Sequence, residues 1–150
     1  MTTLPAISLH QPYASLIAAR LKIHETRSWP APERLLGQRI AIHAAKRFPD
    51  TVEMGPGLRA VCNATFGTRW RELLPRGAFV CTAVLTGQGP TELVTPIGVV
   101  DRYADDWTPG RWAWLLTQVE RFDVPIPANG RQRWWYVDAA ELPTNQQDTP

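Results

Sequence analysis

Residues 8–29 constrain the fold of this chain more than any other stretch of its sequence. They read SLHQPYASLIAARLKIHETRSW, and a short apolar run at 6–9 overlaps their start. Pro12 suits the first turn of a helix, where its missing N–H leaves no hydrogen bond unmade. Apolar residues then recur at helical spacing, and 23–29 alternates as a strand does. The stretch therefore predicts a strand, a helix and a second strand in close succession.

The same stretch carries more polar groups than a hydrophobic core needs. Alternation along 23–29 puts Glu25, Arg27 and Trp29 on one face of the strand, and Lys22 lies just before it. Lys22 is a candidate to bind phosphate, to act as a base or to hold an anionic intermediate. Glu25 with Arg27 either recognises a base edge, moves a proton or forms a structural ion pair. Trp29 either stacks on a base or plugs one end of the fold.

Two further segments add candidates. His10 and Gln11 precede the predicted helix, where free N–H groups favour anions, although Gln11 would equally well cap the helix. His43 and Lys46 share a second alternating strand at 39–46, and His43 is either an acid–base group or a structural histidine. The predicted ligand-binding residues are His10, Gln11, Arg27, Trp29, His43 and Lys46, and the predicted catalytic residues, if there is catalysis, are Lys22 and Glu25.

The composition allows nucleic-acid binding without demanding it. Net charge is +2, and of 16 basic residues only Lys22 and Lys46 are lysine. Arginine suits phosphate and stacks on bases, but a GC-rich genome would also favour it. The 7 Trp residues fill cores and also form stacking platforms. Neither the three His residues nor Cys62 and Cys81 show metal-ligand spacing, so we expect no metal and no cofactor.

The rest of the chain predicts a single domain over 1–140 and a disordered tail over 141–150. Residues 78–85 read as a central strand, 112–126 as one or two strands, 134–137 as a last strand and 58–65 as a helix. Many short strands with few helices predict an α+β fold built as a small barrel. The chain shows no signal peptide and no apolar run long enough for a membrane span, so we expect a cytoplasmic protein without membrane contact.

The segments LHQPYA at 9–14 and KIHETRSW at 22–29 together resemble the signature of the ASCH domain family. IHAAK at 42–46, LPRGA at 74–78, PGRWAW at 109–114 and PIPANG at 125–130 also resemble its members, so the similarity covers about 4–138. The resemblance implies a PUA-like fold, with peripheral helices around a small β-barrel and a cleft at one rim. It also implies recognition of RNA or modified bases.

Some ASCH-like proteins are amidohydrolases of N4-acetylated cytidine, and others have been described as ribonucleases. This sequence departs from the family pattern at two positions. Arg20 stands where the family has a glycine after the first helix. Glu25 stands where the amidohydrolase branch has its nucleophilic threonine, three residues after the lysine.

We therefore expect a module that binds RNA or a modified nucleotide. The alternative is a small hydrolase in the same cleft, with Lys22 and Glu25 acting on a nucleoside amide or an RNA phosphodiester. A third alternative, a domain that docks a protein partner, is allowed by the aromatic content but has no specific motif. The sequence does not decide whether Glu25 binds or reacts.

Overall fold

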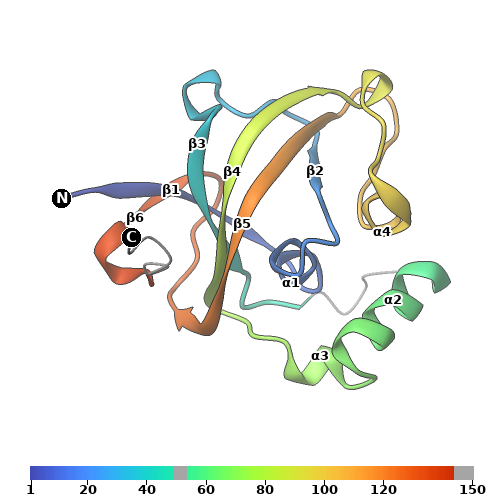
Figure 1. The fold of residues 1–150 in the computed structure, drawn as a ribbon, viewed down its shortest axis with the longest axis horizontal. Coiled ribbons are helices and arrows are strands. Elements are labelled where there is room, and N and C mark those ends of the chain that lie inside the picture. Colours follow the sequence, from blue (N-terminus) through green and yellow to red (C-terminus); the bar gives the residue numbers. More distant parts are fainter. Residues whose placement is uncertain (49–53, 144–150) are drawn as a thin grey trace, which may run out of the picture.

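A computed structural model of the chain describes residues 1–48 and 54–143 and contains one six-stranded mixed sheet (Figure 1). The strands are β1 (Thr3–Leu9), β2 (His24–Arg27), β3 (Gln38–Ala44), β4 (Ala78–Pro90), β5 (Trp112–Pro127) and β6 (Trp135–Asp138). The helices are α1 (Tyr13–Ala18), α2 (Pro56–Phe66), α3 (Trp70–Leu73) and α4 (Gly98–Tyr103), with 3-10 turns at Glu33–Leu35, Thr91–Leu93 and Ala139–Glu141. The predicted α+β class is confirmed.

The strand order is β2-β5-β4-β3-β1-β6, and only the β1–β3 pair is parallel. The strands β4 and β5 form a long hairpin of 13 and 16 residues whose register shifts at three places. Such bulges bend a strand without ending it. The segment predicted as one or two strands over 112–126 is therefore one bent strand.

The sheet curls without closing. Its edges are β2 and β6, and no ladder joins β2 to another edge within the described residues, so a closed barrel is not confirmed. A side chain bridges the open side instead: the Arg27 guanidinium on β2 donates to the Ser8 carbonyl on β1 at 3.3 Å. We call this unpaired boundary between β1 and β2 the seam.

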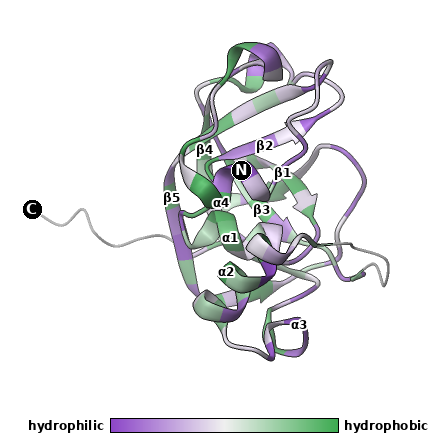
Figure 2. Ribbon diagram, turned by 90° about the vertical axis from the view of Figure 1, so that its right-hand side faces the viewer, coloured by the Kyte–Doolittle hydropathy of each residue, from purple (hydrophilic) through white to green (hydrophobic). Residues whose placement is uncertain are grey.

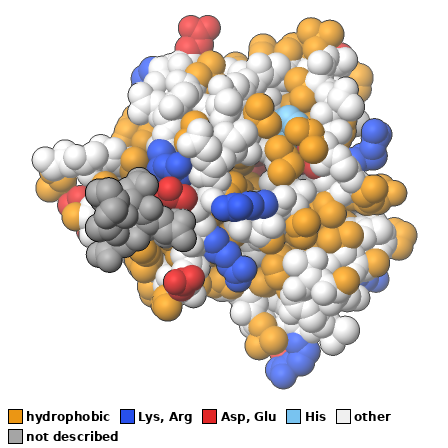
Figure 3. Space-filling model, viewed as in Figure 1, with side chains coloured by type: hydrophobic (Ala, Val, Ile, Leu, Met, Phe, Trp, Pro, Cys, Tyr) orange, Lys and Arg blue, Asp and Glu red, His pale blue; other side chains and the backbone are white. Residues whose placement is uncertain are grey.

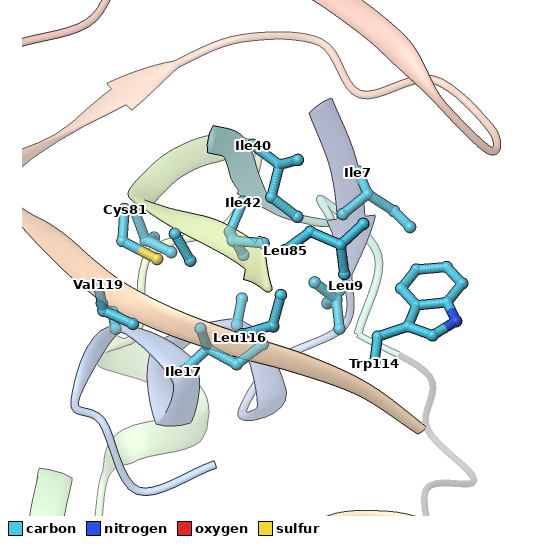
Figure 4. Close-up of a cluster of buried hydrophobic side chains, with 14 of the residues drawn as sticks. Ile7, Leu9, Ile17, Ile40, Ile42, Cys81, Leu85, Trp114, Leu116 and Val119 are labelled. Atoms are coloured by element: carbon cyan, nitrogen blue, oxygen red, sulfur yellow. The ribbon is translucent and has the colours of Figure 1, made fainter. Parts of the chain in front are cut away.

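The concave side of the sheet holds the main core. Figure 4 shows Ile7, Ile42 and Leu85 converging from β1, β3 and β4, with Ile17 of α1 packed among them. Hydrophobic and hydrophilic residues alternate along much of β5 in Figure 2, as expected where one sheet face is buried, whereas the first six residues of β4 are all buried. The helix α1 thus fills the interior of the curled sheet and leaves its polar start beside the seam.

A second apolar cluster joins the helices. Leu16 on α1 packs with Leu58 and Cys62 of α2 and with Trp70 of α3. The two cysteines, Cys62 and Cys81, are free and buried. None of the helices in the described part of the chain is long and apolar enough to cross a membrane.

The exit from α1 keeps a left-handed residue although glycine is absent there. Arg20 has φ 62°, and its guanidinium donates to the Val119 carbonyl at 2.8 Å. A non-glycine residue in this conformation costs roughly 1 kcal/mol, similar to the net gain from one hydrogen bond. Most of the predicted tail, 144–150, lies outside the described residues. Leu142 is buried in a further apolar cluster that includes Phe79, Trp135 and Val137.

Candidate functional site

A cleft of about 530 Å³ opens along the seam. One wall is the end of β1 and the start of α1, and the other is β2 with the segment that follows α4. We call it the carboxylate cleft; its lining residues are Ser8, Leu9, His10, Tyr13, Glu25, Thr26, Arg27, Tyr103, Ala104, Asp105, Asp106 and Arg111. The cleft lies where the sheet fails to close, so its walls are held together by side chains and not by a strand ladder.

Lys22 lies beneath this cleft and is 1% exposed. Its ammonium group donates to Asp105 Oδ1 at 2.5 Å and also to the His24 carbonyl oxygen. Glu25 Oε1 is 3.8 Å from the same nitrogen. One buried cation therefore faces two carboxylates, and it donates hydrogen bonds to two protein oxygens.

The two carboxylates are only partly satisfied. Glu25 Oε2 and Asp105 Oδ2 are both buried and have no hydrogen-bond partner among the described residues. Burial raises the pKa of Asp105 to about 6; Lys22 opposes this shift and Glu25 adds to it. Asp105 therefore titrates near pH 6, beside an acceptor oxygen that no described residue occupies.

Asp101 fixes the position of the segment that carries Asp105. Its carboxylate accepts from the backbone N–H groups of Ile23, His24 and Ile97 at 2.7–2.9 Å and from the His24 ring at 2.6 Å. Burial acts to raise the pKa of Asp101, but these hydrogen bonds outweigh it and hold the pKa below its usual value. The Asp101 interactions thus join α4 to β2 and bring Asp105 over Lys22.

Cationic and aromatic groups surround the mouth of the cleft. Arg27 is 3.9 Å from Glu25 Oε1, and Arg111 donates to the Thr26 carbonyl at 3.1 Å. Burial raises the pKa of Tyr13, and the charges of Asp105, Cys62 and Glu25 raise it further. The Tyr13 hydroxyl therefore remains a neutral donor at neutral pH.

Five of the eight residues predicted as site residues lie at this cleft or beside it. Glu25, Arg27 and His10 line it, and Lys22 lies under it. His10 is exposed and donates from Nδ1 to the Arg47 carbonyl at 3.1 Å. Trp29 lies next to Arg27, whose guanidinium carbon is 5.8 Å from the centre of its ring.

Gln11 and His43 are buried at 1% exposure and line neither this cleft nor the second cleft described below. Gln11 accepts from the Ser15 N–H at 3.0 Å and donates to the Pro75 carbonyl at 2.8 Å. His43 Nε2 donates to the Ala128 carbonyl at 2.8 Å, and its Nδ1 accepts from the Ser8 hydroxyl at 2.9 Å. Burial lowers the pKa of His43, so the ring is neutral at neutral pH.

Trp29 also borders a small aromatic cavity of about 380 Å³ with Arg133 and Trp134. Its ring meets Trp114 edge to face at 5.0 Å, and Trp114 stacks on Trp134 at 5.7 Å. The predicted alternatives for Trp29, stacking on a base and plugging the end of the fold, are both compatible with this position.

Lys46 lies in a second cleft of about 710 Å³, at the end of the sheet where β3 and β5 end and β4 begins (Figure 1). We call it the basic cleft; its lining residues are Lys46, Arg76, Gly77, Pro127, Ala128, Asn129 and Gly130. The sequence motifs therefore contribute to two clefts rather than one.

On the face seen in Figure 3 the basic side chains do not form one continuous surface. Figure 3 shows basic and acidic side chains lying together near β5, and Arg39 is 3.7 Å from Glu120. Within residues 1–48 and 54–143 no group of three His, Cys, Asp or Glu side chains is placed to hold a metal ion.

Asp101, Asp105 and Arg111 did not emerge from the sequence as site residues. They belong to a segment that reads only as an acidic, turn-rich loop at 101–110, followed by a strand. Their partners are 77–85 residues away along the chain. The one signal in the sequence is the acidic character of this loop, which could have suggested a partner for Lys22 in the motif segment.

The protein is a small α+β domain in which a curled, open sheet has a cleft at its seam. The ASCH domain model matches residues 7–142, so the chain belongs to the ASCH domain family, and the predicted resemblance is confirmed. No curated protein matches the chain.

Solved structures with the same fold include the ASCH protein of Zymomonas mobilis, at 18% identity and TM-score 0.52, over 91% of this chain and 89% of that one. Two point mutants of that protein match similarly, at 17% and 19% identity and TM-scores of 0.51 and 0.52; each match covers 91% of this chain and 91% or 89% of the mutant. At this identity the likeness supports the fold alone.

Proposed function

We propose that the carboxylate cleft binds RNA or a modified nucleotide, with a base held against Glu25 and Asp105. The ASCH family is PUA-like and has been proposed to bind RNA. What supports the proposal in this chain is the chemistry of the cleft, which offers unused acceptors inside and cations at its mouth.

The two partnerless oxygens, Glu25 Oε2 and Asp105 Oδ2, carry the argument. A buried polar atom without a hydrogen bond costs about 1–3 kcal/mol, so a ligand that donates to it gains that energy. Nucleobases present N–H donors that a carboxylate accepts: uracil offers its ring N3–H, and cytosine and guanine also offer exocyclic amino groups. A ligand lacking N–H donors would leave both oxygens unpaired.

The surroundings suit the rest of a nucleotide. Arg27 and Arg111 line the same cleft, and both are placed to approach a phosphate. Tyr13 and Tyr103 supply aromatic faces on which a base or sugar can pack. Lys22, enclosed and hydrogen-bonded, acts as the fixed counter-charge for the two carboxylates.

The test is binding of a short, fluorescein-labelled single-stranded RNA, followed by anisotropy across pH 5 to 8. Oligouridylate is the probe because the bases of uridine do not titrate in this range. We expect affinity to rise with pH through a midpoint near the Asp105 pKa of about 6, because the ionised carboxylate is the stronger acceptor. The gain should be roughly tenfold, equivalent to about one pKa unit of differential interaction.

Asp105→Asn should remove the pH dependence, and Glu25→Gln should weaken binding at every pH. Asp123→Asn, on the exposed part of β5, is the matched control that removes one carboxylate elsewhere. Unchanged RNA affinity in both cleft variants would show that the carboxylate cleft is not the binding site.

A second function, hydrolysis in the same cleft, is favoured by one observation. Asp105, with its pKa raised to about 6, stands beside Glu25 as an acid–base pair suited to neutral pH. Lys22 would then hold the pair and an anionic intermediate, while Glu25 moves the proton. Incubation with N4-acetylcytidine and with RNA tests this: product formed by the wild type and lost in Glu25→Gln would establish an enzyme, and no product from either substrate would exclude these two reactions.

A further inference from the structure

Ser8 and Gly130 form a common wall between the two clefts, with His43 buried behind them. Ser8 lines the carboxylate cleft, and Gly130 lines the basic cleft. A Cβ atom added to Gly130 would lie 2.7 Å from His43 Cε1 and 2.8 Å from Ser8 Oγ. Only glycine permits this approach, so the loop after β5 lies directly against β1 and the two clefts adjoin each other.

The His43 interactions fix this wall. The imidazole accepts from Ser8 on one side and donates to Ala128 on the other, and therefore joins β1, β3 and the loop after β5. Burial lowers the pKa of His43, so at neutral pH the wall carries no charge of its own. A ligand spanning both clefts meets a neutral, rigid boundary between them.

The charge of the basic cleft is opposite to that of its neighbour. Lys46 and Arg76 are both exposed and line it from two different segments, and no acidic side chain is among its described lining residues. Neither side chain forms a salt bridge within the described part of the chain. Asn129 adds a side-chain amide that donates hydrogen bonds.

The approach to this cleft is also open at backbone level. Gly77 has φ +64°, and its Cα side faces the Lys46 stem, since an added Cβ would lie 3.7 Å from Lys46 Cβ. Gly77 and Gly130 therefore add no side chain to the lining around Lys46 and Arg76, and an oxyanion meets only backbone at these two positions.

We propose that the basic cleft is a phosphate-binding subsite, so that the ligand whose base enters the carboxylate cleft carries a phosphate on the Gly130 side. The inference rests on the proposed function, and it adds that the ligand is a nucleotide and not a free nucleoside. The phosphate comes either from a free nucleotide or from the backbone of a strand, and the two sources are distinguished by the probes.

The strand arm measures the salt dependence of binding. Fluorescein-labelled oligouridylate is titrated with wild type and with Lys46→Ala/Arg76→Ala at several NaCl concentrations between about 50 and 200 mM. Each phosphate neutralised on a single strand contributes roughly 0.7 to the slope of log affinity against log salt, so the double variant, which removes one phosphate subsite, should lose about 0.7 from that slope. Affinity at the lowest salt should fall by roughly tenfold or more.

The matched control is Arg34→Ala/Arg59→Ala, which removes the same net charge from two exposed residues that line neither cleft. Its slope should remain that of the wild type. The nucleotide arm compares uridine with uridine 5′-monophosphate and uridine 3′-monophosphate by NMR titration. A preference for a monophosphate over uridine that disappears in Lys46→Ala/Arg76→Ala assigns the site to a single phosphate; a slope change without such a preference assigns it to a strand.

Three outcomes overturn the inference. RNA binding that is weakened by Glu25→Gln but is equal in the Lys46→Ala/Arg76→Ala variant and its control leaves the proposed function intact and removes the phosphate subsite. Equal losses in variant and control reduce the effect to net charge. A wild type that binds neither the strand nor any mononucleotide removes both the proposed function and the subsite.

Discussion

Asp101 and Asp105 lie four residues apart in the segment between β4 and β5, both have side chains no more than 2% exposed, and their pKa values shift in opposite directions. Asp101 is held below its usual pKa and Asp105 is raised to about 6. Burial acts to raise the pKa of both carboxylates, and the opposite directions reflect the hydrogen-bond donors and charges that act against it at each site.

Both oxygens of Asp101 receive donors, three from backbone N–H groups and one from His24. Asp105 receives Lys22 and the N–H and hydroxyl of Thr26, but all on Oδ1, while Oδ2 receives none. Glu25 adds a like charge nearby. Both oxygens of Asp101 thus have hydrogen-bond donors from the protein, whereas Oδ2 of Asp105 can still accept a hydrogen bond from a ligand.

The largest effect is expected from removal of Asp101, the carboxylate whose oxygens are both hydrogen-bonded. Asp101→Ala leaves three backbone N–H groups and His24 without an acceptor, and breaking a buried charged network of this kind costs about 3–5 kcal/mol. We expect that loss in the free energy of unfolding measured by urea titration at neutral pH.

Asp123→Ala, an exposed change on β5, should shift the same measurement by less than about 0.5 kcal/mol. An equally small effect of Asp101→Ala would mean that other contacts hold the segment to β2 and that the Asp101 hydrogen bonds do not stabilise the fold. The acid limb provides a second check: since the folded pKa of Asp101 is depressed, its stabilising contribution should disappear as pH falls through that value.

The next largest effect is expected from removal of Lys22, the cation that faces Asp105 and Glu25. Lys22→Met leaves Glu25 and Asp105 as two buried acids without a cation, and we expect a loss of about 2–4 kcal/mol near pH 8. Because the folded pKa of Asp105 already exceeds its unfolded value, proton uptake favours the folded state, and stability falls as pH rises from about 4 to 6. Without Lys22 that pKa rises further.

The defect in Lys22→Met should therefore be much smaller at about pH 5 than at pH 8. Guanidinium unfolding at the two pH values measures this difference, with wild type titrated in parallel. A deficit that does not vary with pH would mean that the lost methylene packing and ammonium hydrogen bonds of Lys22, not its charge, stabilise the site.

The smallest effect is expected at the third acid of the segment. Asp106 is exposed, and its ion pair with Arg111 at 3.7 Å is solvated. Asp106→Ala should change unfolding free energy by less than about 0.5 kcal/mol, as most surface changes do. A loss above 1 kcal/mol in thermal or urea unfolding would show that the contribution of each carboxylate in this segment to the free energy of unfolding does not increase with its burial.

The motif stretch was predictable because its information is local. Alternation along 23–29 correctly predicted a strand bearing Glu25 and Arg27, and Pro12 correctly predicted the start of a helix. The length of β5 was left open between one and two strands, since bulges that bend a strand leave no distinct residue pattern. The closed barrel was predicted from strand count, which does not determine whether the edges meet.

The partners of the motif were not predictable, for a physical reason. Asp101 and Asp105 reach β2 across more than 75 residues of chain, and no local spacing reports such a contact. The same holds for Gly130, which reads as part of an Asn-Gly turn although it also permits the approach to His43. A single sequence does not identify residues whose role depends on a neighbour far away along the chain.

The seam has a consequence for how this fold accommodates change. Opening it breaks the Arg27–Ser8 bond and a few side-chain contacts, whereas separating any other neighbouring pair of strands breaks a ladder. We therefore expect the width of the seam to change more easily than the spacing between any two paired strands of the sheet. Substitutions in β2 and in the segment after α4 can alter its width and chemistry while the hydrogen-bonded frame of β1, β3, β4 and β5 is conserved in shape.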